Sequence, residues 1–107
     1  MSYQVRITDT AKQDLREIAF YIAERAMDKE VAKRFVAELR EQCLRLVEFP
    51  QCGASPKDRI LRSMDFRYLV HKDYLIFYNI DEASKVVNVL AIFNAKKDYI
   101  RVMRKFI

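Results

Sequence analysis

Cysteine, histidine, glycine and proline are all scarce in this chain, and their scarcity excludes several kinds of site. There are two cysteines, Cys43 and Cys52, and a single histidine, His71. Structural zinc usually needs four Cys or His ligands, so we expect no metal site, and nothing in the sequence predicts a cofactor. Two cysteines without a CxxC pair do not predict a disulfide, and we expect both thiols to be buried structural side chains.

Long apolar runs are also absent. The longest mostly apolar run covers residues 86–93, far short of the roughly 20 residues that cross a bilayer. The chain does not open on a basic segment followed by an apolar one, so we expect no signal peptide, no membrane partner and a cytoplasmic location. Its 107 residues suit one domain, and we treat 1–107 as that domain.

Positive charge is concentrated in the second half of the chain. The total is 20 Lys and Arg against 15 Asp and Glu, a net charge of +5. Residues 1–50 hold nine basic and nine acidic residues, whereas residues 51–107 hold eleven basic and six acidic ones. This asymmetry favours an anionic partner, either nucleic acid or an acidic protein, and a solubilising surface is the alternative.

Apolar periodicity predicts two helices after a first strand. Alternation indicates a strand over residues 3–8, and helical spacing indicates one helix near residues 10–26 and a second between Asp28 and Pro50. The link between the helices is so short that they should form an antiparallel hairpin. Thr10 and Gln13 fit a capping box for the first helix. Residues 50–64, which hold the only glycine and both prolines, are predicted to form a loop.

Three further strands are expected over residues 65–71, 74–80 and 86–93, joined by short turns that imply antiparallel pairing. The order β-α-α-β-β-β predicts an α+β fold, in which the helical hairpin packs on an antiparallel-rich four-stranded sheet. A basic C-terminal tail follows as a short helix or an arm. The residues that we expect to be buried between hairpin and sheet are Leu15, Ile18, Ile22, Phe35, Leu39, Leu46, Ile76, Tyr78, Val87 and Val89.

Four short motifs follow one another along the chain. The first helix contains A-x-x-D-L at residues 11–15, followed by Ile18, Tyr21 and Ile22, and the second ends in L-x-x-F-P-x-x-G at residues 46–53. Arg67 precedes Y-L-I-F-Y at residues 74–78, and the last strand runs into N-A-K-K-D at residues 94–98. With these motifs in this order, nearly the whole chain resembles the RelE/ParE superfamily of bacterial type II toxins.

The resemblance implies a growth-inhibiting toxin, associated with plasmid stabilization, that a cognate antitoxin neutralises within a hetero-oligomer. We expect the antitoxin to wrap the domain with a C-terminal segment that folds on binding. That segment should bury apolar residues against the hairpin and sheet and place acidic side chains on the basic second-half surface.

The target divides the superfamily: RelE-like members cleave mRNA on the ribosome, whereas ParE-like members poison DNA gyrase. The family's last motif is H-G-R-R-D, where this chain has Asn94, Ala95, Lys96 and Lys97. Asparagine is no general acid or base near neutral pH, and lysine lacks the bidentate fork of arginine. We therefore favour the ParE-like activity. The alternatives are a ribosome-dependent mRNA endoribonuclease and a non-toxic protein-interaction module derived from such a toxin.

Candidate site residues depend on which activity is assumed. Cleaving RNA through its 2′-hydroxyl needs a base, an acid and cations beside the phosphorane, and the nuclease candidates are Arg67, Tyr74, Lys96, Lys97 and Tyr99. The candidates for binding a target or antitoxin are Arg62, Arg67, Lys72, Lys96, Lys97, Asp98, Arg101 and Arg104. Structural roles compete: Arg67 can cover the sheet with its stem, Tyr74 can be a core residue, and Asp98 can cap a helical tail.

Overall fold

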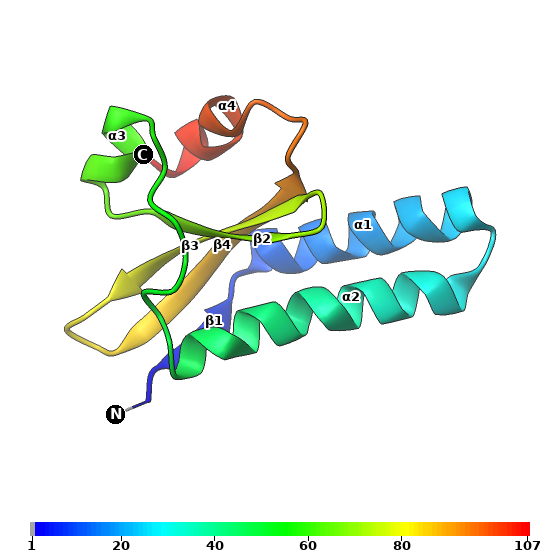
Figure 1. Ribbon diagram of the computed structural model, residues 1–107, viewed down its shortest axis with the longest axis horizontal. Helices are drawn as coiled ribbons and strands as arrows, with labels where there is room; N and C mark the ends of the chain where they lie inside the picture. Colours follow the sequence, from blue (N-terminus) through cyan, green and yellow to red (C-terminus); the bar gives the residue numbers. More distant parts are fainter. Residues whose placement is uncertain (1) are drawn as a thin grey trace.

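The computed structural model describes residues 2–107 and places one sheet between two layers of helix (Figure 1). The predicted α+β fold and the order of its main elements are confirmed. The elements are β1 (Gln4–Ile7), α1 (Asp9–Ala26), α2 (Lys29–Leu44), the 3-10 turn η1 (Arg45–Val47), α3 (Arg59–Ser63), β2 (Arg67–His71), β3 (Tyr74–Asp81), β4 (Val86–Asn94), α4 (Tyr99–Met103) and the 3-10 turn η2 (Arg104–Phe106).

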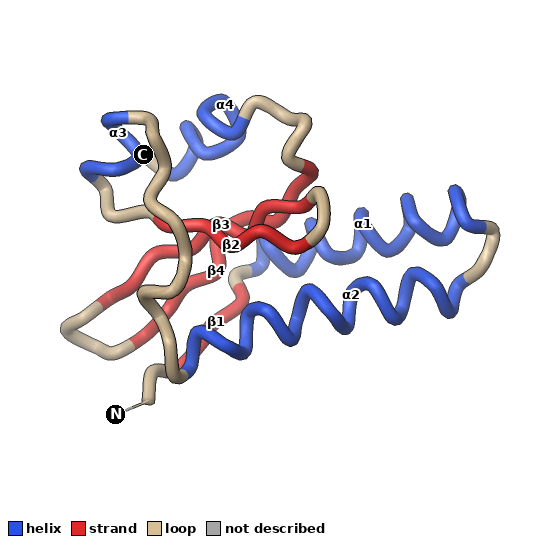
Figure 2. Tube along the Cα trace, viewed as in Figure 1, coloured by secondary structure: helices blue, strands red, loops and turns tan. Residues whose placement is uncertain are grey.

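The four strands lie in the order β1-β4-β3-β2, with β1 parallel to β4 and the other pairs antiparallel. Figure 2 shows the strands as a single red layer with the long helices along one side. The pairing of β3 and β4 contains a bulge: Phe77 faces Ala91, but Tyr78 faces Val89, so Leu90 is one residue extra. A bulge places two neighbouring residues opposite one and shifts the alternation of the strand beyond it.

The hairpin of α1 and α2 forms as its apolar spacing predicts. Helix α2 begins after Asp28, whose carboxylate caps it by accepting from the Glu30 amide at 2.9 Å. The expected cap of α1 is wrong, because Thr8 supplies it: the Thr8 hydroxyl accepts from the Ala11 amide and donates to the Val89 carbonyl. Thr8 therefore fixes the start of α1 to the edge of β4.

The main core lies between the hairpin and one face of the sheet. Leu15, Ile18, Leu39 and Leu46 are buried there, and Ile22 and Phe35 pack against them. From the sheet the predicted residues Ile76, Tyr78, Val87 and Val89 are all fully buried. The predicted core is therefore confirmed for eight of its ten residues, and Ile22 and Phe35 are only half-buried.

The opposite face of the sheet has a second core, which sequence periodicity did not predict. Its buried residues are Leu61, Phe66, Phe77, Ala91, Phe93 and Met103. The expected loop 50–64 contains the short helix α3, capped by Asp58, whose carboxylate accepts from the Leu61 amide at 3.1 Å. The C-terminal tail forms α4 and η2 and packs on this face, so it is a helix and not a free arm.

Asp14, the acidic residue of the first motif, completes the outer edge of β4. Strand β1 ends opposite Val89, and the Asp14 carboxylate accepts from the next free amide, that of Ile92, at 2.9 Å. Burial raises the pKa of Asp14, and the Ile92 hydrogen bond partly opposes that rise. The Asp14 carboxylate thus gives the Ile92 amide the hydrogen-bond acceptor that a neighbouring strand would otherwise provide.

The two thiols differ from each other. Cys43 is buried in the main core, and burial raises its pKa to about 11. Cys52 is exposed, so the expectation that both thiols are buried is wrong for this residue: it lies in the loop after Pro50, where the chain leaves the core. Within residues 2–107, no helix is long and apolar enough to span a membrane.

Candidate functional site

Unpaired cations gather on the side of the sheet that α3 and α4 cover. We call this set the basic face; its exposed members are Arg59, Arg62, Lys96, Lys97, Arg101, Arg104 and Lys105. None of these side chains forms a salt bridge within residues 2–107. Figure 1 places α3, α4 and the chain end together on that side, away from the hairpin. Much of the excess positive charge of residues 51–107 therefore lies on one surface, which is suited to binding a polyanion.

The exit of β4 holds Lys96 and Lys97 in place. The Asn94 side-chain oxygen accepts from the Lys96 amide at 2.9 Å, and its backbone oxygen accepts from the Lys97 amide at 3.0 Å. The Ala95 amide donates to the Asp73 carbonyl at 2.8 Å, which ties this exit to the β2–β3 turn. Asn94 thus builds the turn that presents the two lysines.

Asp98 and Tyr99 connect the exit to α4. The Asp98 carboxylate caps α4 by accepting from the Ile100 amide at 3.1 Å, which is the structural role that the sequence analysis gave as the alternative to binding. The Tyr99 ring stacks on Phe77, with centroids 5.8 Å apart and planes 17° apart. Both residues therefore join the basic face to the second core.

Arg67 fastens the loop after α2 to the sheet. Its guanidinium donates to the Gly53 carbonyl at 3.1 Å and to the Gln51 carbonyl at 3.3 Å. Beside it, the buried Tyr78 hydroxyl donates to the Pro50 carbonyl at 2.7 Å and accepts from the Gly53 amide at 2.9 Å. Burial raises the pKa of Tyr78. The F-P-x-x-G motif is accordingly a loop held by two side chains of the sheet.

Tyr74 faces the hairpin and not the basic face. Its ring is buried and meets Phe35 edge-on, with centroids 5.3 Å apart. Burial raises the pKa of Tyr74, while a hydrogen bond from the Asn94 side chain lowers it, and the net direction is upward. A raised pKa disfavours the tyrosinate form that a general base requires.

Lys72 belongs to a small polar cluster against α2. The Glu38 carboxylate oxygen lies 2.8 Å from the His71 Nε2 and 3.2 Å from the Lys72 Nζ. Sequence reasoning missed Glu38, because it lies on a helix more than thirty residues before its partners. No group of three His, Cys, Asp or Glu side chains in the described part of the chain could hold a metal ion.

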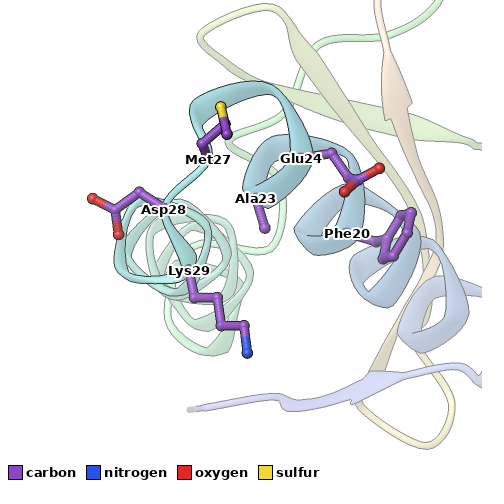
Figure 3. A pocket seen from close by; sticks show the side chains of 6 residues that line it. All are labelled: Phe20, Ala23, Glu24, Met27, Asp28 and Lys29. Atoms are coloured by element: carbon purple, nitrogen blue, oxygen red, sulfur yellow. The ribbon is translucent and has the colours of Figure 1, made fainter.

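A second surface is an apolar groove of about 520 Å³ between α1 and α2; the sequence predicted an antitoxin contact on the hairpin but not the residues that line this groove. We call it the hairpin groove; it is lined by Ala19, Phe20, Ala23, Lys29, Ala32, Lys33, Val36, Ala37 and Arg40. It continues into a pocket of about 300 Å³ at the hairpin end, where Phe20, Ala23 and Lys29 lie near Met27 (Figure 3). The available signal was large apolar residues, Phe20 and Met27, outside the buried stripe of α1.

Comparison with known families decides what kind of protein carries these surfaces. The family described as the ParE toxin of the type II toxin–antitoxin system ParDE matches residues 5–99. The chain belongs to the ParE toxin family. It is therefore a toxin of the type II toxin–antitoxin class within the RelE/ParE superfamily, as the motifs suggested. No curated protein matches the chain significantly.

Solved structures agree with this ParE fold. A chain of the RelBE2 toxin–antitoxin complex from Mycobacterium tuberculosis is 23% identical, with a TM-score of 0.66, covering 88% of this chain and 99% of the other. A chain of the chromosomal ParDE system from P. aeruginosa is 19% identical, with a TM-score of 0.71 and coverage of 86% and 95%. A double mutant of the E. coli toxin RelE in the free state is 13% identical, with a TM-score of 0.65 and full coverage of both chains.

The Glu38 cluster makes the stability of this ParE-family toxin depend on pH. Hydrogen bonds from His71 and then Lys72 lower the pKa of Glu38 below its ordinary 4.5. A lowered carboxyl pKa stabilises the fold above the unfolded value, and the stabilisation is lost as pH falls through the folded value. We therefore expect the stability gap between the wild type and Glu38→Gln to shrink when urea unfolding is measured from pH 6 down to pH 3.

Glu41→Gln is the matched control for that experiment, because Glu41 is exposed on the same helix and makes no salt bridge within residues 2–107. Its stability difference from the wild type should stay small across the range. A gap for Glu38→Gln that does not change with pH would contradict the role given to this carboxylate.

Proposed function

We propose that this ParE-family toxin arrests growth by binding a DNA-handling target of the gyrase type through its basic face, and not by cutting mRNA. The observation that carries the proposal is that the exposed cations do not lie beside side chains that are free to act as a general acid or base. The cations of the basic face are exposed and unpaired within residues 2–107, while the titratable side chains that could transfer protons are engaged elsewhere.

The tyrosines support this separation. Tyr74 and Tyr78 face the main core with raised pKa values, and Tyr99 is stacked on Phe77. Asn94, where the family often has histidine, uses its side chain to build a turn. General acid–base catalysis typically contributes about 10²–10⁴-fold for each group, so a site without a poised pair is a poor nuclease.

Arg67 is better explained as a binding or structural residue than as a catalytic one. Its guanidinium donates to two loop carbonyls and is half-buried. Both hydrogen bonds leave from Nη1, so Arg67 holds the loop with one end of its guanidinium and keeps only Nη2 and Nε for any contact with a target. The side chains of Lys96 and Lys97 form no salt bridge or hydrogen bond within residues 2–107, and we propose that they contact the target first.

We propose that the antitoxin binds the basic face. Two of the similar structures are described as toxin–antitoxin systems, which supports a cognate antitoxin for this chain. We propose that one segment of it is acidic and covers the basic face, because an unpaired group of cations attracts carboxylates over roughly a Debye length of about 8–10 Å. Neutralisation then consists of occupying the surface that the target needs.

Induction of the full chain in cells without an antitoxin tests the mechanism. We expect growth arrest with lost DNA supercoiling or double-strand breaks, and with mRNA intact by primer extension. Lys96→Glu/Lys97→Glu should raise survival by at least about tenfold, because it reverses two charges of the basic face. The matched control Lys12→Glu/Arg34→Glu makes the same change in net charge on exposed hairpin positions and should still arrest growth.

Two outcomes would contradict the proposal. Early cuts in translated mRNA in phase with codons, abolished by Arg67→Ala in a folded protein, would establish the RelE-like endoribonuclease. No growth arrest from a soluble, folded chain would establish the non-toxic interaction module.

A further inference from the structure

We propose that Glu38, on α2, is a positioning residue for the basic face: it holds the β2–β3 turn, and that turn holds the exit of β4, which presents Lys96 and Lys97. The role of the two lysines rests on the proposed function, whereas the contacts that lead to them rest on the structure. The consequence is that a residue on the hairpin side of the sheet sets the geometry of a surface on the other side.

The β2–β3 turn has a backbone conformation that lysine does not favour by itself. His71 pairs with Tyr74, so the turn consists of Lys72 and Asp73 alone. The φ angle of Lys72 is 54°, in the left-handed region that glycine and asparagine adopt more readily than lysine does. A lysine at this position is explained by what its ammonium group contacts.

Helix α2 supplies the contacts that hold this turn. One Glu38 carboxylate oxygen lies 3.2 Å from the Lys72 Nζ and 2.8 Å from the His71 Nε2. Phe35 lies one turn earlier on the same face of α2. The Lys72 Nζ lies over the Phe35 ring, 5.4 Å from its centroid, and the Tyr74 ring meets Phe35 edge-on. Two side chains of one helix therefore contact three residues of the turn and its flanks.

The turn in its own right holds the exit of β4. The Ala95 amide donates to the Asp73 carbonyl at 2.8 Å, and the Asn94 side-chain nitrogen donates to the Asp73 carboxylate at 3.5 Å. The Asn94 side-chain oxygen accepts from the Lys96 amide at 2.9 Å. Figure 1 shows the β2–β3 turn and the end of β4 together at one end of the sheet. A shift of the turn therefore moves the backbone that carries both lysines.

The ion pair at Glu38 is better suited to positioning than to global stability. Hydrogen bonds from His71 and then Lys72 lower the pKa of Glu38, so the carboxylate stays charged and keeps both partners. Its side chain is 34% exposed, and ion pairs that water reaches contribute little to the free energy of unfolding. Loss of the pair should therefore loosen the turn locally while the rest of the chain stays folded.

Exchange of backbone amides with water, measured by NMR on the full chain, tests these contacts. Glu38→Lys places a like charge beside Lys72, and we expect the Ala95 amide to exchange at least about threefold faster than in the wild type. The Ala54 amide, which donates to the Tyr68 carbonyl at 2.9 Å on another loop, should exchange at an unchanged rate. This amide separates local loosening from a general loss of structure.

Two further variants make the test specific. Glu41→Lys makes the same change in charge at an exposed position of α2 that forms no salt bridge within residues 2–107, and it should leave the Ala95 amide unchanged. Glu38→Lys/Lys72→Glu restores an ion pair with its charges exchanged. It should return the exchange rate of Ala95 to within about twofold of the wild type. None of these positions is buried, so the variants should fold, and circular dichroism checks this.

Induction in cells without an antitoxin tests the consequence for the basic face. Glu38→Lys should raise survival at least about threefold, although it adds positive charge, which by itself favours an anionic target. Glu41→Lys adds the same charge and should arrest growth as the wild type does. The exchanged pair, Glu38→Lys/Lys72→Glu, should restore the arrest.

The inference is overturned if Glu38→Lys leaves the exchange of the Ala95 amide unchanged, if the Ala54 amide accelerates as much, or if the exchanged pair restores neither exchange nor arrest. It is also overturned if the Ala95 amide accelerates and the variant still arrests growth fully, because Glu38 then holds the turn without positioning the lysines. A wild type that fails to arrest growth contradicts the proposed function instead, and the amide exchange is measured independently of it.

Discussion

Replacing Gly53 by alanine will lower the free energy of unfolding by about 2–5 kcal/mol, the sum of overpacking and a disturbed buried hydrogen bond. A Cβ atom at this position would lie 2.5 Å from the Tyr78 hydroxyl oxygen, 2.8 Å from Tyr78 Cε1 and 2.9 Å from the Tyr68 carbonyl oxygen. Tyr78 is fully buried, and Tyr68 is held by two backbone hydrogen bonds to Ala54. Neither neighbour can move away cheaply, so the loop itself must shift.

A double-mutant cycle with Tyr78→Phe identifies the cause of the loss. Tyr78→Phe alone should cost about 1–3 kcal/mol, because the Pro50 carbonyl and the Gly53 amide lose their shared partner. In that background Gly53→Ala should cost less than in the wild type, since the closest oxygen is gone. Ser55→Ala, at an exposed position of the same loop, is the control and should stay within about 0.5 kcal/mol. A cost below about 1 kcal/mol for Gly53→Ala in urea unfolding would refute the close contact.

Leu39→Ala is the second substitution with a large expected effect, a loss of about 2–5 kcal/mol. Leu39 has no exposed surface and lies in the main core between α2 and the sheet. Truncation removes buried methyl groups and leaves a cavity that the two helices and the sheet cannot close completely. Reversible urea unfolding followed by circular dichroism measures the change, and the slope with denaturant should stay constant.

Leu44→Ala provides the comparison for Leu39. Both leucines belong to α2, but Leu44 is 62% exposed. The residue types and the atoms removed are the same, and Leu44 differs in being exposed and in being the last residue of α2. We expect Leu44→Ala to change stability by less than about 0.5 kcal/mol. Equal losses for the two variants would show that the assigned faces of α2 are wrong.

Sequence periodicity was a good guide wherever an element was long enough to repeat. The hairpin helices have 18 and 16 residues, and their stripes run over several turns, so the main core was predictable residue by residue. Helix α3 has five residues, which is little more than one turn and gives no period. Its only buried residue is Leu61, and the second core formed around it was therefore missed.

The sequence predicted which charged residues the site contains, but not what each side chain contacts. The sequence predicted the excess of cations in the second half, and the seven of the basic face form no salt bridge within residues 2–107, whereas Arg67 and Lys72 are engaged with the loop and with Glu38. The engagement of Arg67 and Tyr78 with the loop depends on contacts across 14 to 28 positions in the chain. No local pattern contains such information. The lining of the hairpin groove was not predicted for another reason: Phe20 lies out of phase with the buried stripe of α1.

The bulge at Leu90 limits how the length of β4 can change. Upstream of it Val87 and Val89 face the hairpin, and downstream of it Ala91 and Phe93 face the opposite side. Loss of one residue here would exchange the two sides for one part of the strand, burying the wrong side chains in both cores at once. The number of residues in β4 is thus constrained by both cores at once. We therefore expect a one-residue deletion to be tolerated better in the turns on either side of β4 than within the strand.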